Sequence, residues 1–590
     1  MIQRDETFDV AIIGGGPAGS TAGTLLKKYN PDLRVAILEK ARFPRDHIGE
    51  SQLPAIGPIL DEMGAWDKIE AAGFPVKVGA SYTWGRDRDQ WNFDFFPLEN
   101  YRDEPRPGTF EGQRRHTAFQ VDRSIYDNVL LRHAEEAGCE VHEETQVREV
   151  LREGDRVEGL KLDTGATVRA NHYIDASGHV SLLRRAMDVG TWQPEELKNI
   201  AMWDYWQNAE WAVEIGSGAT RIQIRSLPYG WIWFIPLGPT RTSIGLVAPV
   251  SWYKESGKTP EEIYCEAIES QPEIKALLKH ATAEGNFQTC KDWSNLADRP
   301  VGENWFMAGE SAGFADPILS AGMTLAHNAG REAAYTILEL ERGELEAGWL
   351  RGRYGERIRE SITQHIRFAQ YWYAANSCFT DLKDNCSRIA KEAGLRLTPE
   401  HAWRWLSLGG FTSEFVGAVS LGSFGVTHTR KLIELFDQKG RSSRTTVDGY
   451  NVFTLDLRNA EAGHVGILTD GRIQRAPCYR RAGKMLPLVG LFGQMAEWLK
   501  ATDDAKTLAG LMQRHAATYY GAASAGAFVS GCYEALDAMV QDGWVLRKLD
   551  KKKPVLRLNA SGSRTIRTKA DEDAALAGSD VPIVDRLKSE

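Results

Sequence analysis

An α/β fold with more than one domain is the fold class that the sequence predicts, and three observations lead to it. The chain has 590 residues, which at roughly 150 residues per domain is too long for one hydrophobic core. A strand, a glycine-rich turn and a helix follow one another near the N-terminus, and similar signals return in residues 305–340. Hydrophobic residues make up 42% and charged residues 26% of the chain, which excludes a wholly disordered or collagen-like protein.

Residues 1–185 alternate strands and helices in the order expected of a Rossmann-like domain. The apolar residues 8–13 predict a strand, and the glycines of residues 14–19 predict the turn that follows it. The next elements are expected as a helix over 20–29, a strand over 35–38, a helix over 122–138, and strands near 141 and over 147–151, 157–162 and 172–174.

A second, β-rich part is predicted from residues 76–84, which alternate in polarity, and from residues 200–249. The stretch between residues 84 and 118 is rich in charge and aromatic side chains, and we expect it to be a lid or a mobile loop. The chain also holds 18 tryptophans, which fit either an aromatic-walled cavity or thick core packing.

Residues 346–559 change in character and predict a mostly helical C-terminal domain that serves as a lid or an interaction module. A helix over 525–541, followed by a hairpin of 544–549 with 555–558, resembles a winged-helix element. Because the whole chain is acidic, packing or protein interaction is favoured over DNA reading. Residues 560–590 are polar and small, and we expect a disordered tail.

Composition narrows the classes of function. The net charge of −9 argues against a large sequence-independent nucleic-acid surface. No apolar run approaches the ~20 residues that span a bilayer, and the first residues lack the pattern of a secretion signal. Seven cysteines without a Cys-x-x-Cys pair favour a reduced cytoplasmic protein. We therefore expect no nucleic-acid partner, no membrane partner and no metal.

The most informative local pattern is Gly14-x-Gly16-x-x-Gly19, because it follows a predicted strand and opens a helix. Such glycines let the backbone approach a pyrophosphate at the helix N-terminus, and a tight turn without any ligand is the alternative. Glu39 ends the second strand, where a carboxylate can accept the hydroxyls of a ribose. The pattern predicts a dinucleotide site.

Three further segments resemble the para-hydroxybenzoate-hydroxylase-like flavoproteins. Arg45 with Gly49-Glu50-Ser51 is similar to the segment over the flavin, residues 175–185 to the second family stretch, and residues 309–317 to the third. Glu310 stands where that family usually has Asp. The resemblance implies FAD as the cofactor, bound by Gly14, Gly16, Ala18, Gly19, Glu39, Arg45, Glu50, Ser51, Arg123, Asp175, Gly309, Glu310, Pro317 and Gly322.

The resemblance also sets the expected domains. An FAD-binding core over residues 1–345 is expected to consist of cofactor segments 1–75, 118–185 and 300–345 and a substrate-side sheet of 76–117 and 186–299. A second glycine-rich strand–turn–helix is missing from the sequence. A separate NAD(P)H flavin reductase is therefore the expected source of reduced FAD.

Residues 230–236 resemble the Trp-x-Trp-x-Ile-Pro signature of flavin-dependent halogenases, and a second signature of that family is carried by Phe314, Pro317, Ser320 and Gly322. Lys77 lies on a strand similar to the lysine strand of pyrrole and phenol halogenases. Taken singly, paired tryptophans can be core residues and a strand lysine is usually solvated. Together the signatures imply a halogenase.

The resemblance implies a mechanism. Reduced FAD and O₂ give a C4a-hydroperoxide that oxidises chloride or bromide, held by the backbone N–H groups of Ala321 and Gly322, to hypohalous acid. Trp231 and Trp233 separate substrate from flavin, Lys77 delivers the halogen, and Ser320 is a further candidate catalytic residue.

Leu319 stands where tryptophan halogenases carry a glutamate, so we expect an electron-rich aromatic or activated acyl substrate, free or tethered to a carrier protein. An FAD-dependent monooxygenase or an isoprenoid-type reductase is the alternative on the same fold. A flavin-binding scaffold or redox sensor is a third hypothesis.

Overall fold

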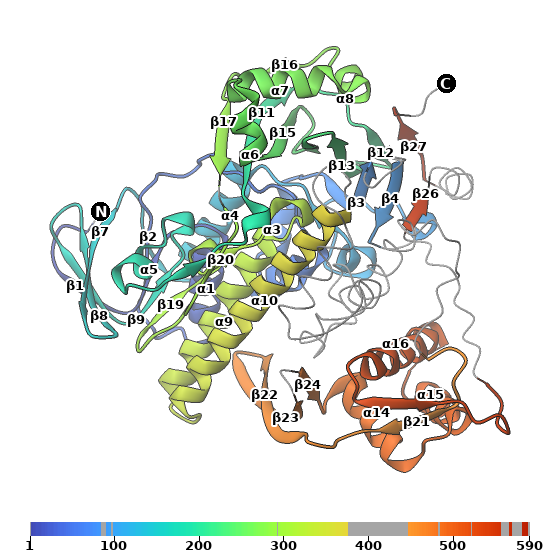
Figure 1. Cartoon of the computed structure of the whole chain (residues 1–590). Coiled ribbons are helices and arrows are strands. Elements are labelled where there is room, and N and C mark those ends of the chain that lie inside the picture. The colour runs from blue at the N-terminus through green and yellow to red at the C-terminus, as the bar shows by residue number, and fades with distance from the viewer. Residues whose placement is uncertain are drawn as a thin grey trace. The chain divides into compact units, whose positions relative to one another are not determined.

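The computed structural model describes residues 2–83, 90–95, 98–291, 293–375, 447–481, 484–520, 522–555, 566–568 and 581–587. The chain folds as two compact units (Figure 1). The first consists of Met1–Asn385 with Arg564–Glu590, and the second consists of Cys386–Ser563.

The nucleotide-side sheet of the first unit has seven strands in the order β6-β2-β1-β9-β8-β7, with β19 on β9. Its centre is parallel, because β1 pairs in parallel with both β2 and β9. Helices cover both faces of such a sheet, which explains the nearly continuous apolar sequence of β1 and β2. The strands are β1 (Glu6–Ile13), β2 (Val35–Leu38), β6 (Glu140–His142), β7 (Val147–Glu153), β8 (Arg156–Leu162), β9 (Thr167–Asp175) and β19 (Trp305–Met307).

The helices of this domain pack around α1 (Pro17–Tyr29), which contacts both α4 (Arg123–Glu136) and α9 (Gly322–Arg342). Figure 1 shows α9 and the long α10 (Ala347–Ala375) running next to each other. The shorter helices are α2 (Gly57–Met63), α3 (Trp66–Ala71) and α5 (Leu182–Ala186). The predicted α/β class with a Rossmann-like sheet is therefore confirmed.

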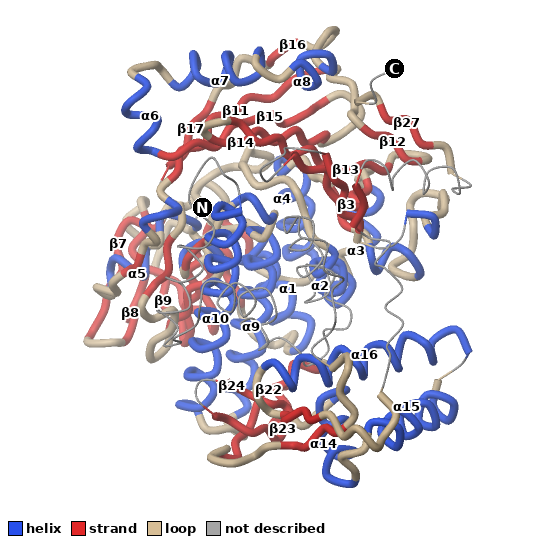
Figure 2. Tube along the Cα trace, turned by 45° about the vertical axis from the view of Figure 1, so that its right-hand side comes forward, coloured by secondary structure: helices blue, strands red, loops and turns tan. Residues whose placement is uncertain are grey.

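The second sheet, called the large sheet below, has twelve strands, and its main path is β16-β11-β15-β14-β13-β3-β4-β26. Strands β3 and β14 flank β13 on either side, which brings residue 77 and residues 231–233 into one sheet. Figure 2 shows α7 and α8 along one side of this sheet. The strands are β3 (Val76–Thr83), β4 (Gln90–Asp94), β5 (Ala118–Phe119), β11 (Asn199–Gln207), β12 (Val213–Ile215), β13 (Ala219–Leu227), β14 (Gly230–Pro236), β15 (Arg241–Pro249), β16 (Thr282–Ala283), β17 (Gln288–Lys291), β26 (Ile566–Thr568) and β27 (Ile583–Asp585).

Connecting elements complete the first unit. A small sheet joins β10 (Thr191–Trp192), β18 (Asn295–Ala297) and β20 (Gly313–Phe314). Beside the large sheet lie α6 (Val250–Ser256), α7 (Pro260–Glu269) and α8 (Pro272–Leu277). Among the residues that the structure describes, no helix combines the length and apolar composition that a membrane crossing requires.

The described part of the second unit packs three helices and two small sheets around an apolar core that includes Phe453, Met495, Leu536 and Trp544. The strand expected over 544–549 is β25 (Val545–Lys548), and its antiparallel partner is β21 (Val452–Leu455). Most of the second arm of the expected hairpin, residues 556–558, lies outside the described residues. The other elements are β22 (Glu461–Thr469), β23 (Arg472–Arg481), β24 (Lys484–Pro487), α14 (Gly490–Ala501), α15 (Ala505–Tyr519) and α16 (Ala522–Gln541).

Three features differ from the sequence-based expectations. The expected loop between residues 84 and 118 contains β4, which pairs with β3. Helix α10 belongs to the first unit, although residues from 346 onward were expected to start the C-terminal domain. The expected disordered tail supplies β26 and β27, which add to the large sheet. Edge pairing needs only a few residues without turn or periodicity signals, so the sequence does not reveal it.

Candidate active site

The glycine turn lies at the carboxyl end of β1. Gly14 has a φ of 104°, and a Cβ there would lie 2.4 Å from the carbonyl oxygen of Ala176. A Cβ on Gly19 would lie 2.0 Å from the carbonyl oxygen of Gly14, so both positions require glycine. Helix α1 begins at Pro17 with no acidic residue in its first turn and no side-chain cap on Gly16. This N-terminus fits the pyrophosphate of a dinucleotide.

Glu39 shapes the same turn from the end of β2. Its buried carboxylate accepts hydrogen bonds from the backbone N–H of Gly15 at 2.8 Å and of Ala41 at 2.9 Å. Each oxygen keeps a second lone pair with which it can accept a ribose hydroxyl. Ala18 is buried against α9, where a Cβ on Gly330 would lie 2.3 Å from its carbonyl oxygen.

Two arginines converge on Asp127 beside the turn. Arg123 makes a bidentate ion pair with the Asp127 carboxylate at 2.7 and 2.9 Å, and Arg45 approaches it to 3.4 Å. The Nη1 of Arg123 also donates to the carbonyls of Ile48 and Gly49, both at 3.0 Å. A Cβ on Gly16 would lie 3.7 Å from Nη2 of Arg45. Positive charge thus stands where an anionic cofactor group would bind.

Asp175, predicted as a cofactor-binding residue, lies at the end of β9. Its buried carboxylate accepts the backbone N–H of Ser177 at 3.0 Å and of Leu183 at 2.7 Å, so it builds the turn after β9. Gly309 has a φ of 68° and packs close to Ala18. Burial acts to lower the pKa of Arg123, but the ion pair with Asp127 and, to a smaller extent, the negative charge of Glu310 raise it overall.

Lys77 is buried at the middle of the site, with 2% of its surface exposed. Its Nζ donates hydrogen bonds to Ser51 Oγ at 2.7 Å, to the Gln52 carbonyl at 2.9 Å and to Ser320 Oγ at 3.4 Å. None of these oxygens carries a formal charge, and burial lowers the pKa of Lys77 to about 7. The amine is therefore partly neutral near physiological pH.

The segment before α9 carries Ser320 to this lysine. Ser320 has a left-handed φ of 56°, which ends the short helical turn that Pro317 begins and leads into α9. Ala321 is buried and precedes Gly322, the first residue of α9, whose first turn holds no acidic residue and has no side-chain cap. A Cβ on Gly322 would lie 2.9 Å from the Phe314 ring. Backbone N–H groups beside Lys77 can thus receive an anion.

Both tryptophans of β14 are buried and their indoles are held by hydrogen bonds. The ring centroids are 5.9 Å apart, as expected for residues two positions apart on one face of a strand. Trp231 Nε1 donates to the Tyr373 hydroxyl at 3.0 Å, and Trp233 Nε1 donates to Ser243 Oγ at 3.1 Å. Gly245 leaves room for Trp233, since a Cβ there would lie 2.1 Å from its ring.

The sequence did not predict the residues that contact these two tryptophans. Tyr373 on α10 donates to Asp316 Oδ1 at 3.0 Å, and Trp293 Nε1 reaches Asp316 Oδ2 at 3.4 Å. Burial raises the pKa of Asp316 to about 7, although the hydrogen bonds that it accepts oppose this. Asp316 lies between Phe314 and Pro317 of a signature and could have been found there. Tyr373 lies in a helix without any local motif.

Glu50 is a further buried carboxyl of the site. Burial raises its pKa to about 7, while hydrogen bonds from the side chains of Tyr205 and Ser243 oppose the shift. Its Oε1 has no hydrogen-bond partner among the described residues. In the described part of the chain no three His, Cys, Asp or Glu side chains gather closely enough to hold a metal ion.

Comparison with known proteins identifies the family. The model of the tryptophan halogenase family matches residues 9–106 and 103–381, which is more than half of the chain. A tryptophan 2-halogenase from Chondromyces crocatus is 35% identical over 354 residues, 58% of this chain and 64% of that relative, slightly under two thirds of its length. A 1H-pyrrole-2-carbonyl-(peptidyl-carrier protein) chlorinase from Pseudomonas fluorescens is 32% identical over 64% of this chain and 86% of the relative.

Solved structures agree with this result. The myxobacterial chondrochloren halogenase CndH is 29% identical with a TM-score of 0.58, over 68% of this chain and 92% of that chain. The flavin-dependent halogenase CmlS aligns over 94% of this chain and 98% of its own with a TM-score of 0.69, and at 24% identity it shows the fold alone. The predicted family is confirmed: the chain belongs to the flavin-dependent halogenases, a family of FAD-using oxidoreductases.

Proposed function

We propose that this chain halogenates an organic substrate with hypohalous acid that Lys77 positions. The observation that supports this most strongly is the environment of the amine. Lys77 is buried, its pKa is lowered to about 7, and its hydrogen bonds go only to uncharged oxygens. A structural lysine at such a site would normally pair with a carboxylate.

The residues around the glycine turn fit FAD. Gly14, Gly16 and Gly19 clear the space above the N-terminus of α1, and Arg45 and Arg123 add positive charge beside it. Reduced FAD bound there, with O₂, supplies the oxidising power that converts chloride or bromide into hypohalous acid. We propose that the backbone N–H groups of Ala321 and Gly322 hold the halide before this conversion.

Lys77 then acts on the hypohalous acid. A neutral amine either donates a hydrogen bond to this molecule or is halogenated itself, in which case a nitrogen–halogen bond forms and water leaves. Ser320 and Ser51 hold the amine in place in both cases. The substrate carbon attacks the halogen and loses a proton, and exclusion of water keeps the hypohalous acid from escaping.

Trp231 and Trp233 act as a wall in this proposal. Each indole is fixed by its own hydrogen bond, to Tyr373 and to Ser243, so neither ring turns without breaking a buried contact. A fixed wall keeps the organic substrate away from the cofactor while small halogen species pass.

We propose an electron-rich aromatic ring or an activated acyl group as the substrate, free or tethered to a carrier protein. Relatives named as carrier-protein-bound pyrrole halogenases support tethering. Leu319 supports a substrate other than free tryptophan, because an apolar side chain cannot help to remove a proton from an indole. A separate NAD(P)H flavin reductase would deliver reduced FAD, and the cysteine pattern supports a cytoplasmic location.

The test compares Lys77→Ala with Lys198→Ala, an exposed lysine that pairs with Glu195. Each protein is loaded with FAD, reduced by a flavin reductase and NADH, and supplied with O₂ and bromide. Monochlorodimedone traps free hypohalous acid, while halogenation of a phenol and a pyrrole panel is followed by mass spectrometry. We expect Lys77→Ala to retain FAD and peroxide release but lose halogenated product at least about 100-fold. Lys198→Ala should match the unchanged protein.

Two results would contradict the proposal. Product that forms at the same rate and at the same ring position in Lys77→Ala removes Lys77 from the reaction. Oxygenated product, with no dependence on halide in any variant, moves the function to a monooxygenase.

A further inference from the structure

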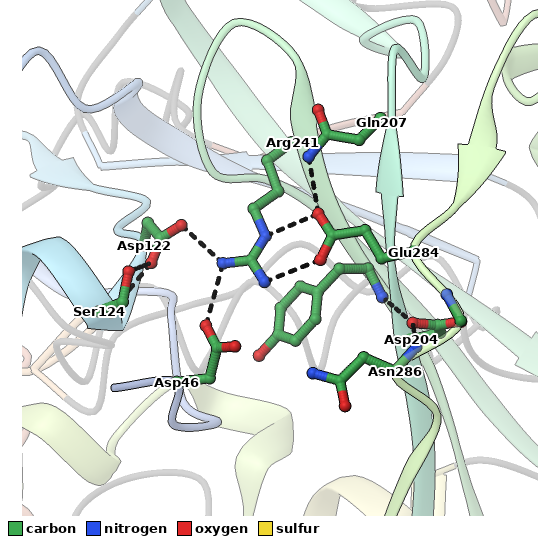
Figure 3. A network of polar contacts seen from close by, with 10 residues as sticks. Asp46, Asp122, Ser124, Asp204, Gln207, Arg241, Glu284 and Asn286 are labelled. Atoms are coloured by element: carbon green, nitrogen blue, oxygen red, sulfur yellow. Dashed lines mark hydrogen bonds and ion pairs between the residues drawn. The ribbon is translucent and has the colours of Figure 1, made fainter. Parts of the chain in front are cut away.

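Arg241, the first residue of β15, joins three carboxylates that come from distant parts of the chain (Figure 3). Its Nε and Nη2 donate to the two oxygens of Glu284, both at 3.0 Å. Its Nη1 donates to Asp122 at 2.7 Å and to Asp46 at 3.2 Å. The guanidinium lies 3.9 Å from the centroid of the Tyr205 ring.

Each carboxylate is itself held by its own segment. Asp122 caps α4 by accepting the N–H of Ser124 at 2.9 Å. Glu284 follows β16 and also accepts Gln207 Nε2 at 2.6 Å. Asp46 lies in the loop after β2, and among the described residues its ion pair to the large sheet is the one with Arg241.

The loop that Asp46 belongs to links the two ends of the active site. Arg45, its neighbour, stands beside Gly16 in the glycine turn. Ser51, five residues beyond Asp46, accepts the hydrogen bond of Lys77. Between them the carbonyls of residues 48 and 49 are held by Arg123. The loop therefore spans the cofactor end and the halogen end of the site.

We propose that Arg241 is a positioning residue that fastens the loop of residues 45–51 to the large sheet and thereby retains FAD. This inference rests on the proposed function only in its choice of cofactor. Arg241 would do so without touching FAD, through Asp46 on one side and through the α4 cap at Asp122, next to Arg123, on the other.

Charge makes Arg241 hard to replace. One cation offsets three carboxylates, so a neutral residue leaves Asp46, Asp122 and Glu284 facing one another. Repulsion would then push the loop outward, away from the sheet. A lysine restores the charge but cannot bind Glu284 through two parallel bonds and still reach the other two carboxylates.

The experiment measures FAD dissociation from the oxidised, full-length holoenzyme, without halide, reductant or substrate. The recovery of flavin fluorescence after dilution gives the rate, and visible circular dichroism reports the environment of the bound flavin. We expect about tenfold faster dissociation for Arg241→Gln, with roughly threefold for Arg241→Lys and for Asp46→Asn. The circular dichroism of the bound flavin should change in all three.

Arg299→Gln is the matched control. Like Arg241, Arg299 lies over an aromatic ring, that of Trp305, and pairs with a carboxylate, but among the described residues it pairs with Asp155 alone, at 2.7 Å. This variant should lower the melting temperature without changing FAD dissociation. Unchanged dissociation in Arg241→Gln, or in both milder variants if that protein does not fold, overturns the inference. A chain that proves not to halogenate, yet loses FAD faster in these variants, overturns the proposed function alone.

Discussion

Lys77 shows how burial sets the chemistry of a single residue. The folded chain lowers its pKa to about 7 from the ordinary 10.5, because the charged form loses its hydration. Between these two values the unfolded chain binds a proton that the folded chain does not. Folding therefore becomes more favourable as the pH rises from 7 toward 10.5, and below pH 7 the folded chain carries the full cost of a buried charge.

Replacing Lys77 by methionine tests this at the residue scale. The methionine variant keeps a long, unbranched side chain that is one atom shorter, and it removes the titrating group. We expect its advantage in stability over the unchanged protein to be largest below pH 7. Above pH 7 the advantage should shrink by about 1 kcal/mol per pH unit. Melting temperatures measured from pH 6 to pH 9 show the slope, with Lys198→Met as the control. A constant difference across this range contradicts the assigned burial cost.

At the scale of the element, β14 and β15 form the wall as a pair. Trp233 from β14 lies over Gly245 of β15, its partner in the antiparallel register. Gly245→Ala would place a methyl group inside the space of the indole, which costs about 1–3 kcal/mol and displaces the ring. We expect a lower melting temperature and more peroxide released per molecule of halogenated product.

The comparison that isolates this contact is a double-mutant cycle. Trp233→Leu removes the ring that clashes, so the double variant with Gly245→Ala should be less destabilised than the sum of the single changes. Gly238→Ala serves as the control, because a Cβ there meets nothing within 4 Å. Additive melting-temperature changes in the cycle would show that the alanine acts elsewhere.

The elements of the site differ in how far the sequence predicted them. The glycine turn, the tryptophan pair and Lys77 were predicted because each belongs to a continuous motif of a known family. Arg241 and Asp46 are 195 residues apart. Arg241 stands in no motif, and Asp46 lies within the segment of residues 45–51 without being one of the residues that carry its family resemblance. Tyr373 meets Asp316 only through the packing of α10. Contacts of this kind depend on tertiary structure, and local spacing does not encode them.

The same limit appears at the scale of the whole molecule. Residues 583–585 carry no periodic pattern, and their polar surroundings predicted disorder. The structure pairs them with residues 213–215 as β27 on β12, and Arg586 bridges Glu210 and Glu214. Val581 and Leu587 are buried at the two ends of this strand. The C-terminal residues therefore complete the sheet that holds Lys77 and the tryptophan wall.

A truncation that removes β27 tests this contribution to the sheet. A chain that ends before Val581 loses the burial of two aliphatic side chains and the ion pairs of Arg586, together worth about 2–4 kcal/mol. We expect its melting temperature to fall by several degrees while FAD remains bound, because β12 pairs with β13 only at Ala219, whereas the two tryptophans lie opposite Ile224 and Ser226, farther along β13. A chain lacking only residues 588–590 should melt like the full protein. Equal melting temperatures of the two truncated chains would show that β27 contributes no stability. Loss of FAD from the shorter chain would show that this edge of the sheet supports the cofactor site directly.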